Sequence, residues 1–332
     1  MMEMTWEEWK AMKKGLRRHL GATGWILVVY YIILNVSVFL WTFAETLIKS
    51  VQYILSGDFN AMEQVMYTAA ESGWGYFLAA LIGFVILLIW KKPRFWREQI
   101  WAKGKPMKCG TFFGLLCVFL GGQLLSQVML VGLELILNLF GLTIVEGVEA
   151  LSVDPDNFSL FLYASLLAPI SEEILFRGLI QRSLMPFGKR FAIFCSAFTF
   201  GLFHGNLIQT PYAFVVGLVL GYVAAEYSIG WAMLLHMINN LLIADSLNRL
   251  TSGLTEEAAA IVIWAVLLFF GVAAIVVLIS RRRNIRLWRE QETINKTYLG
   301  CFFASAGMIV FVVMMTIMMV VSLYLMITPI SM

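Results

Sequence analysis

Long apolar runs separated by short polar segments dominate the pattern of residues along this chain. Runs of about 18 or more apolar residues are long enough to cross the hydrocarbon core of a bilayer as helices. The sequence therefore predicts an all-α fold, a polytopic transmembrane helical bundle of about eight to nine spans. The predicted spans cover residues 23–46, 73–90, 110–140, 157–183, 191–208, 212–229, 230–247, 257–280 and 298–327.

Two of these runs have irregular features. The third run is too long for one straight span, and its Gly121-Gly122 pair indicates a kink or a re-entrant break. The sixth and seventh runs are separated only by the segment around Ser228. We expect a tight turn there.

The first 22 residues have a different, amphipathic pattern. Thr5 and Glu8 are spaced as in a capping box, and apolar and basic side chains then fall largely on different sides of the predicted helix. We interpret residues 1–22 as an interfacial helix that anchors the chain at the membrane surface. The remaining divisions are N-terminal spans in 23–150, a central group of spans in 155–250 and C-terminal spans in 256–332.

Composition and charge support a membrane protein and predict its orientation. Of the 332 residues, 60% are hydrophobic and 14% are charged, which excludes an ordinary soluble domain. With the N-terminus inside, 21 of the 24 Lys and Arg residues fall on one side of the predicted layout. The loop 141–156 on the other side is acidic. By the positive-inside rule the N-terminus is cytoplasmic, and an odd number of spans places the C-terminus outside.

Three charged residues, Glu172, Glu173 and Arg177, lie within the fourth apolar run. A charge near the centre of a bilayer costs a few kcal/mol, so such residues usually face the bundle interior and mark function. We therefore expect a conical intramembrane polar cavity. Glu173 and Arg177 are four residues apart and can pair on one helix face, which favours a structural role for this pair. Glu172 is rotated by about 100° and can point into the cavity.

Other residues suited to chemistry lie downstream on two further predicted spans. They are His204, and the pair His236 and Asn240, which share a helix face because they are four residues apart. A carboxylate removed from water is a better base, so Glu172 can take a proton from a water held beside it by His204. His236 and Asn240 are suited to donate hydrogen bonds to an oxyanion. We also expect Pro169 to loosen the helix before the carboxylates and to free a carbonyl.

Other mechanisms and other polar residues remain open at this point. Ser171 adjoins the carboxylates, but no nucleophile motif surrounds it. One Glu and two His are sufficient for a zinc site, although no H-E-x-x-H helix occurs and the four cysteines have no metal-ligand spacing. Five further polar residues in or near spans are interpreted as structural or as lining an aqueous path: Gln123, Gln127, Glu134, Glu226 and Asp245.

Three short motifs in this order resemble those of the CPBP intramembrane proteases. They are Glu-Glu-x-x-x-Arg at 172–177, Phe-x-x-x-His at 200–204 and His-x-x-x-Asn at 236–240. The family includes type II CAAX prenyl endopeptidases and bacterial bacteriocin-processing and Abi-type members. The resemblance covers residues 155–250 and does not extend with comparable force to the first three or the last two spans.

The resemblance implies a glutamate-dependent, metal-independent endopeptidase without a cofactor. By similarity, Glu172 and His204 activate the hydrolytic water, His236 and Asn240 form the oxyanion hole, and Glu173 and Arg177 support the site. The implied substrate is a membrane-associated peptide or protein, either of the CAAX type or a bacteriocin, pheromone or envelope regulator. The expected location is the bacterial plasma membrane, with the lipid bilayer as a partner and no nucleic acid.

Two other classes of function compete with the protease. A non-catalytic membrane scaffold can keep the same fold while regulating a cell-envelope enzyme or a sensor kinase. A transporter or proton-coupled channel also places Glu, Arg and His inside a membrane. The chain lacks paired broken helices in corresponding halves, so we rank the transporter last.

Overall fold

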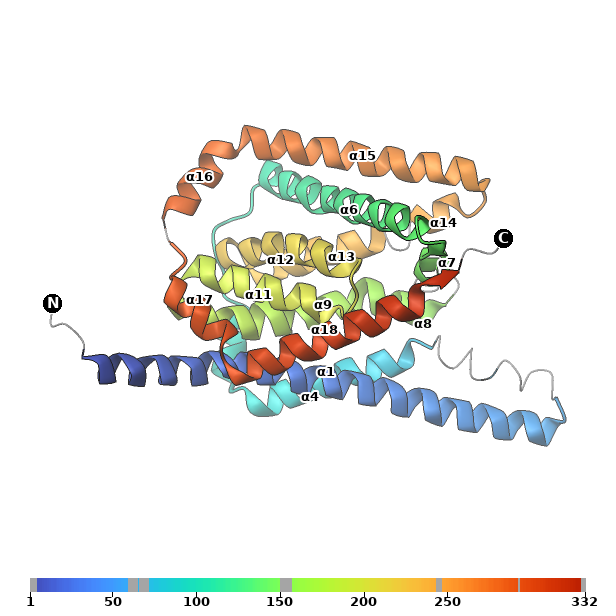
Figure 1. The fold of residues 1–332 in the computed structure, drawn as a ribbon, viewed down its shortest axis with the longest axis horizontal. Coiled ribbons are helices and arrows are strands. Elements are labelled where there is room, and N and C mark those ends of the chain that lie inside the picture. Colours follow the sequence, from blue (N-terminus) through green and yellow to red (C-terminus); the bar gives the residue numbers. More distant parts are fainter. Residues whose placement is uncertain are drawn as a thin grey trace.

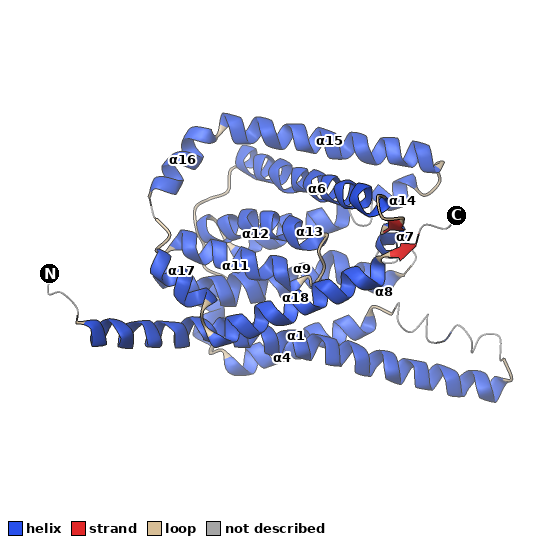
Figure 2. Ribbon diagram, viewed as in Figure 1, coloured by secondary structure: helices blue, strands red, loops and turns tan. Residues whose placement is uncertain are grey.

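The computed structural model is an all-α bundle, as the apolar runs predict (Figure 1). Within the described residues, the strands β1 (Leu142–Thr143) and β2 (Thr328–Pro329) form one short antiparallel pair (Figure 2). Asp245 and residues 150–156 of the acidic loop, both considered above, lie outside the described residues. The structure describes residues 5–58, 65, 72–149, 157–242, 247–291 and 293–329.

The described helical elements follow one another along the chain in this order. The α-helices are α1 (Trp6–Ser56), α4 (Trp74–Trp90), α5 (Pro93–Phe95), α6 (Cys109–Asn138), α7 (Val145–Glu149), α8 (Phe158–Leu162), α9 (Ala168–Glu173), α10 (Arg182–Leu184), α11 (Lys189–Phe203), α12 (Gln209–Glu226), α13 (Ile229–Asn239), α14 (Leu247–Thr251), α15 (Glu256–Ser280), α16 (Arg282–Glu290), α17 (Lys296–Phe303) and α18 (Ala306–Met326). The other helical segments are η1 (Trp96–Ile100), η2 (Tyr163–Leu167) and η3 (Ile174–Gln181), which are π-helical, and the short 3₁₀ turn η4 (Met185–Phe187).

The bundle has three layers with the central elements enclosed (Figure 1). The middle layer contains α9, η3, α11, α12 and α13. It is covered on one side by α6 and α15, and on the other by α1 and α4. Helix α18 runs across the front and contacts both α1 and α11. The polar residues of the central layer are therefore shielded from lipid by these outer helices.

Helix α1 is a single helix of 51 residues. Its N-cap is Thr5, whose side chain accepts from the backbone N–H of Glu8, and Glu8 bonds back to the N–H of Thr5. This confirms the predicted capping box. At 1.5 Å per residue α1 is about 76 Å long, more than twice the thickness of a bilayer core. The amphipathic first part is thus continuous with the first span.

Five helices in the described residues are long and apolar enough to cross a membrane, or six if a bent pair counts as one span. The bent pair is Trp74–Ile89 with Pro93–Ile100, at an angle of 110°. The five are Trp6–Ser56, Cys109–Asn138, Phe158–Phe187, Glu256–Ser280 and Ala306–Met326. Helices α11 and α13 are shorter, at 15 and 11 residues. The protein is therefore an integral membrane protein in which two of the central helices, α11 and α13, are short.

The expected break at Gly121-Gly122 does not occur. Helix α6 continues without interruption through both glycines. A Cβ on Gly121 would lie 2.6 Å from Cβ of Ala274 and 2.7 Å from the carbonyl oxygen of Phe270, both on α15. The absence of a side chain at Gly121 therefore allows α6 and α15 to pack closely, as small residues commonly do in membrane bundles.

The first and last long helices meet at a second glycine contact. A Cβ on Gly24 of α1 would overlap the backbone of Gly307 on α18, and a Cβ on Gly307 would overlap the carbonyl oxygen of Gly21. The backbones of α1 and α18 are thus in direct contact. The last predicted span, 298–327, is in fact two helices, because α17 ends at Phe303 and α18 begins at Ala306.

A buried carboxylate ties the turn between α12 and α13 to its neighbours. Glu226, with a 4% exposed side chain, accepts from Nζ of Lys105 at 2.6 Å and of Lys189 at 2.7 Å. It also accepts from Nε1 of Trp288 at 3.1 Å. The contact with Glu226 raises the pKa of Lys105, which lies in the loop before α6. Helix α13 begins two residues after Tyr227, so the tight turn expected around Ser228 is present.

Candidate active site

The carboxylates lie on a helix whose hydrogen bonding changes register. The helical stretch 158–187 alternates between α-helical and π-helical turns, and η2 ends just before Pro169. The N–H of Ala168 bonds to the carbonyl oxygen of Tyr163, and Pro169 has no N–H. The carbonyl of Ala164 is therefore left without a partner from the helix. It accepts instead from Nδ2 of Asn240 at 2.8 Å. Pro169 thus frees a carbonyl as the sequence predicts.

Glu173 and Arg177 form a fully buried ion pair. Nη1 of Arg177 lies 3.1 Å from Oε1 of Glu173, and both side chains are 0% exposed. Nη2 of Arg177 donates to the carbonyl oxygen of Gly217 at 3.3 Å. The guanidinium also lies over the ring of Phe200, 4.3 Å from its centre, which adds a cation–π contact. The predicted pairing on one helix face is therefore present.

Glu172 has a different environment from its neighbour. Its side chain is 25% exposed, whereas that of Glu173 is completely buried. Tyr30 of α1 and Tyr163 of η2 lie close enough to interact electrostatically with the Glu172 carboxylate. Ser171, which adjoins Glu172, donates to the carbonyl oxygen of Ala168 at 3.0 Å. The two carboxylates are thus separated as expected, one buried and one accessible.

His236 contacts both glutamates. Its Nδ1 lies 3.1 Å from Oε1 of Glu173, and its Nε2 lies 3.8 Å from Oε2 of Glu172. The ring is nearly buried and packs edge-on against Phe200, with 5.8 Å between ring centres. Sequence spacing could not indicate this contact, because α13 and α9 come together only in the folded bundle.

His204 lies at the end of α11 and not inside a span. The helix ends at Phe203, and Gly205 follows with a φ of 64°, which favours glycine. Nδ1 of His204 bonds to the carbonyl oxygen of Phe200 at 2.9 Å. Its ring is close enough to interact electrostatically with the Glu172 carboxylate. The structure therefore brings His204 toward the same carboxylate as His236, from another helix.

The bonds at Nδ1 determine which nitrogen of each neutral histidine carries the proton. A carbonyl or carboxylate oxygen can only accept, so Nδ1 of His204 and Nδ1 of His236 are the donors to Phe200 and Glu173. In the neutral rings Nε2 is then an acceptor that can bind a water proton. As an oxyanion donor, Nε2 of His236 must first be protonated.

Asn240 is held by a polar network that sequence reasoning found only in part. Besides its bond to Ala164, its Oδ1 accepts from Nδ2 of Asn239 at 3.1 Å. Oδ1 of Asn239 accepts from Tyr212 at 3.0 Å and from Gln123 at 3.2 Å, and Gln123 donates to Tyr212 at 2.8 Å. Gln123, a polar residue in an apolar run, was the one signal of this network. Residues of η2, α6 and α12 thus fix the Asn240 amide, the last two through Asn239.

The metal alternative has no support in the arrangement of side chains. Among the residues that the structure describes, no group of three or more His, Cys, Asp or Glu side chains is arranged to hold a metal ion. His236 contacts the carboxylates of Glu172 and Glu173, and His204 bonds to the carbonyl oxygen of Phe200. The catalytic roles assigned to these residues from the sequence stay predictions.

Comparison with known proteins identifies one family. The family model described as type II CAAX prenyl endopeptidase Rce1-like matches residues 154–242, which include all six candidate site residues. No curated protein and no solved structure matches the chain. The match covers α8 to α13, the enclosed central layer of the bundle. Residues 154–242 of this integral membrane protein therefore match the Rce1-like, type II CAAX prenyl endopeptidase family.

Proposed function

We propose that the protein is an intramembrane, glutamate-dependent endopeptidase that uses no metal. It hydrolyses a peptide bond in a membrane-associated peptide or protein. The observation that carries this proposal is the asymmetry of the two carboxylates within a protease-family domain. Glu172 is accessible and lies beside His236, whereas Glu173 is buried against Arg177.

In the proposed reaction a water molecule bound beside Glu172 attacks the scissile carbonyl carbon. Glu172 takes one proton of this water, with His204 holding the water through its Nε2 atom. A C–O bond forms while the carbonyl oxygen becomes an oxyanion. The C–N bond then breaks, and the leaving nitrogen takes the proton from Glu172. The products are a carboxylic acid and an amine, which exchange a proton to give a carboxylate and an ammonium group, and no covalent intermediate with the enzyme is needed.

His236 and Asn240 stabilise the oxyanion in this scheme. One N–H of the Asn240 amide bonds to Ala164, which leaves the second N–H for the substrate. His236 contributes from Nε2 when its ring is doubly protonated, a state that the two neighbouring carboxylates can balance in charge. Glu173 and Arg177 hold the His236 ring in place.

The substrate classes that fit are a prenylated CAAX-type protein, and a bacteriocin, pheromone or envelope regulator. We further propose the bacterial plasma membrane as the location, with a cytoplasmic N-terminus. The short central helices α11, α12 and α13 would add to the five or six long spans and approach the eight to nine predicted from the apolar runs. A conical polar cavity between them would admit water to Glu172.

The test uses the full-length protein reconstituted in liposomes, with a farnesylated fluorogenic CAAX peptide as substrate. We expect Glu172→Gln and His204→Ala to lower kcat by about 10²- to 10⁴-fold, the usual range for a lost acid–base group. His236→Ala and Asn240→Ala should also lower kcat by about 10²- to 10³-fold. Glu134→Gln is the matched control, because Glu134 bonds to Thr143 and Ile144, away from the site.

Three results would contradict the proposal. Retained cleavage in Glu172→Gln would exclude the glutamate as the base. Loss of cleavage in 1,10-phenanthroline, restored by zinc, would establish a metal mechanism. A cellular phenotype of the gene that persists in the inactive variant would favour the scaffold, in which binding and not hydrolysis carries the function.

A further inference from the structure

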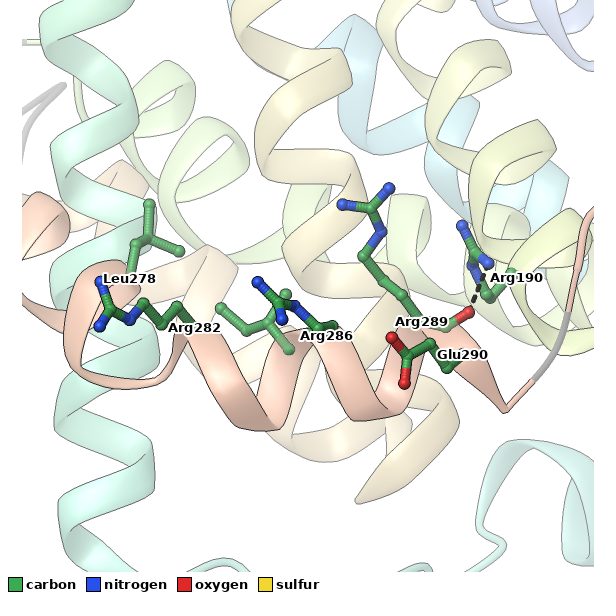
Figure 3. A pocket seen from close by; sticks show the side chains of 7 residues that line it. Arg190, Leu278, Arg282, Arg286, Arg289 and Glu290 are labelled. Carbon is green, nitrogen blue, oxygen red and sulfur yellow. Dashed lines mark hydrogen bonds between the residues drawn. The ribbon is translucent and has the colours of Figure 1, made fainter.

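An arginine-lined cavity lies outside the candidate active site. It has a volume of about 570 Å³ and lies between α16, the end of α15 and the start of α11. Figure 3 shows Arg282, Arg286 and Arg289 spaced along α16, with Arg190 of α11 opposite the last of them. The other lining residues are Leu278, Ile285 and Glu290.

The arginines of α16 are close together and carry like charges. Arg282, Arg286 and Arg289 are spaced by four and three residues, so they project from one face of the helix. Like charges at this spacing destabilise a helix. Within the described part of the chain, none of these three arginines forms an ion pair. Glu290 is the one acidic residue in the lining. A bound anion would offset this repulsion.

Contacts to the neighbouring helices hold α16 in place. Trp288 donates from Nε1 to the buried Glu226 at 3.1 Å and packs edge-on against Tyr222, with 5.3 Å between ring centres. Nη1 of Arg190 donates to the carbonyl oxygen of Arg289 at 2.6 Å. Helix α16 is therefore fixed to α11 and α12, so the backbone that carries the three arginines is in place before a ligand arrives.

The position of the cavity indicates the source of the anion. Helix α16 begins two residues after the span α15 ends at Ser280. The apolar side chains of Ile285 and Leu287 on the same helix are 37% and 51% exposed. An amphipathic basic helix placed directly at the end of a span lies at the level of lipid headgroups.

We propose that this cavity binds the phosphate group of an anionic phospholipid. A guanidinium matches the oxygens of a phosphate with two parallel hydrogen bonds, and several arginines can share one phosphate. The exposed apolar side chains of α16 then contact the first part of the acyl chains. This inference does not depend on the proposed peptidase activity.

The experiment measures lipid binding to the full-length protein in dodecyl maltoside by native mass spectrometry. Dioleoyl phosphatidylglycerol is titrated against dioleoyl phosphatidylcholine. We expect one tightly bound phosphatidylglycerol, and a Kd about fivefold weaker for each arginine removed in Arg286→Gln and in Arg282→Gln/Arg286→Gln. The matched control is Arg281→Gln/Arg283→Gln, which removes the same charge next to the cavity but not from its lining.

The outcomes separate a specific site from general attraction. Equal weakening in the two double variants, or equal binding of phosphatidylcholine, would overturn the proposal. Displacement of the lipid by millimolar inorganic phosphate would overturn the assignment to a lipid and indicate a soluble phosphate ligand. The thermal unfolding midpoint without lipid should not fall in any variant, so loss of folding would be recognised.

Discussion

Glu172 and Glu173 are adjacent in the chain but differ completely in their contacts. Glu173 lies 3.1 Å from both Arg177 and His236 through the same oxygen, and it has no exposed surface. Glu172 has a partly exposed side chain and no cationic partner as close. A carboxylate that is fixed by two neighbours is suited to hold a histidine in position, and one that is accessible is suited to react.

The different contacts of the two glutamates predict separate effects on stability. Glu173→Gln should lower the free energy of unfolding by about 3 kcal/mol, because it leaves the charge of Arg177 buried without its partner. Glu172→Gln should change it by less than about 0.5 kcal/mol. Unfolding in mixed detergent micelles, followed by tryptophan fluorescence, measures both values.

The surface pair Arg94–Glu98 provides the control for this measurement. Its side chains are 80% and 48% exposed, so Glu98→Gln should change stability by less than about 0.5 kcal/mol. In the double variant Glu173→Gln/Arg177→Met, part of the lost stability should return. A large loss in Glu172→Gln with none in Glu173→Gln would contradict the assignment.

Most of the residue-level site was predictable from spacing, but the partner of His236 was not. The four-residue spacing of Glu173 and Arg177 predicts their pairing, and the rotation of about 100° per residue predicts that Glu172 faces elsewhere. The contact between His236 and Glu173 joins residues 63 positions apart. It depends on how α13 docks against α9, which no local pattern contains.

At the scale of elements, the π-helical turns before and after the carboxylates determine the shape of the site. The register change in η2, together with Pro169, leaves the Ala164 carbonyl to Asn240. π-helical turns inside α-helices are frequent at functional sites. Here one such turn connects the helix of the carboxylates to the helix of the proposed oxyanion donor.

Replacement of Pro169 tests this connection. Pro169→Ala supplies an N–H that can bond to the Ala164 carbonyl in place of Asn240. We expect kcat to fall by up to about a hundredfold as the Asn240 amide loses its orientation, with an unchanged KM and a thermal midpoint at least as high. The assay is cleavage of the farnesylated peptide over a range of concentrations.

Pro93→Ala is the control for this prediction, because Pro93 is the first residue of α5 and a proline there costs no helical bond. It should leave kcat unchanged. Unchanged kcat in Pro169→Ala as well would show that Asn240 does not depend on the freed carbonyl.

The elements themselves were predictable where apolar runs end in polar residues. The two-residue turn before α13 follows from Ser228, which caps the helix by accepting from Trp231. Two features were not predictable. The Gly121-Gly122 pair does not break α6, because Gly121 packs closely against α15 and Gly122 against α12, and the break between α17 and α18 falls within an apolar stretch. Glycine alone does not distinguish a bend from a close contact.

At the scale of the whole molecule, the bundle encloses its polar layer between long outer helices. Helices α6 and α15 cover one side, and α1 and α4 cover the other (Figure 1). The apolar pattern identified these outer helices well because each is long. The same apolar pattern predicted complete spans at α11 and α13. Both helices are short, and their ends carry site residues such as His204 and Asn240.

We propose that the two ends of the bundle lie on opposite sides of the membrane. Helix α1 begins and α18 ends at opposite ends of the molecule (Figure 1). We expect alkaline phosphatase to be inactive when fused near the N-terminus or at residue 291, and active when fused after residue 329, because only exported phosphatase folds. Green fluorescent protein at the same positions should give the reverse pattern. Fluorescence after residue 329 would contradict the layout.

The glycine contact between α1 and α18 has a consequence for biogenesis. The first helix enters the membrane long before the ribosome has made Gly307. The face of α1 that carries Gly21 and Gly24 therefore lacks this contact while the other helices are inserted. The backbone contact of Gly24 with Gly307 can form only once α18 has left the translocon. The protein therefore completes its tertiary structure after synthesis. A chain that stops before α18 exposes the α1 surface that α18 would cover to the quality-control proteases of its membrane.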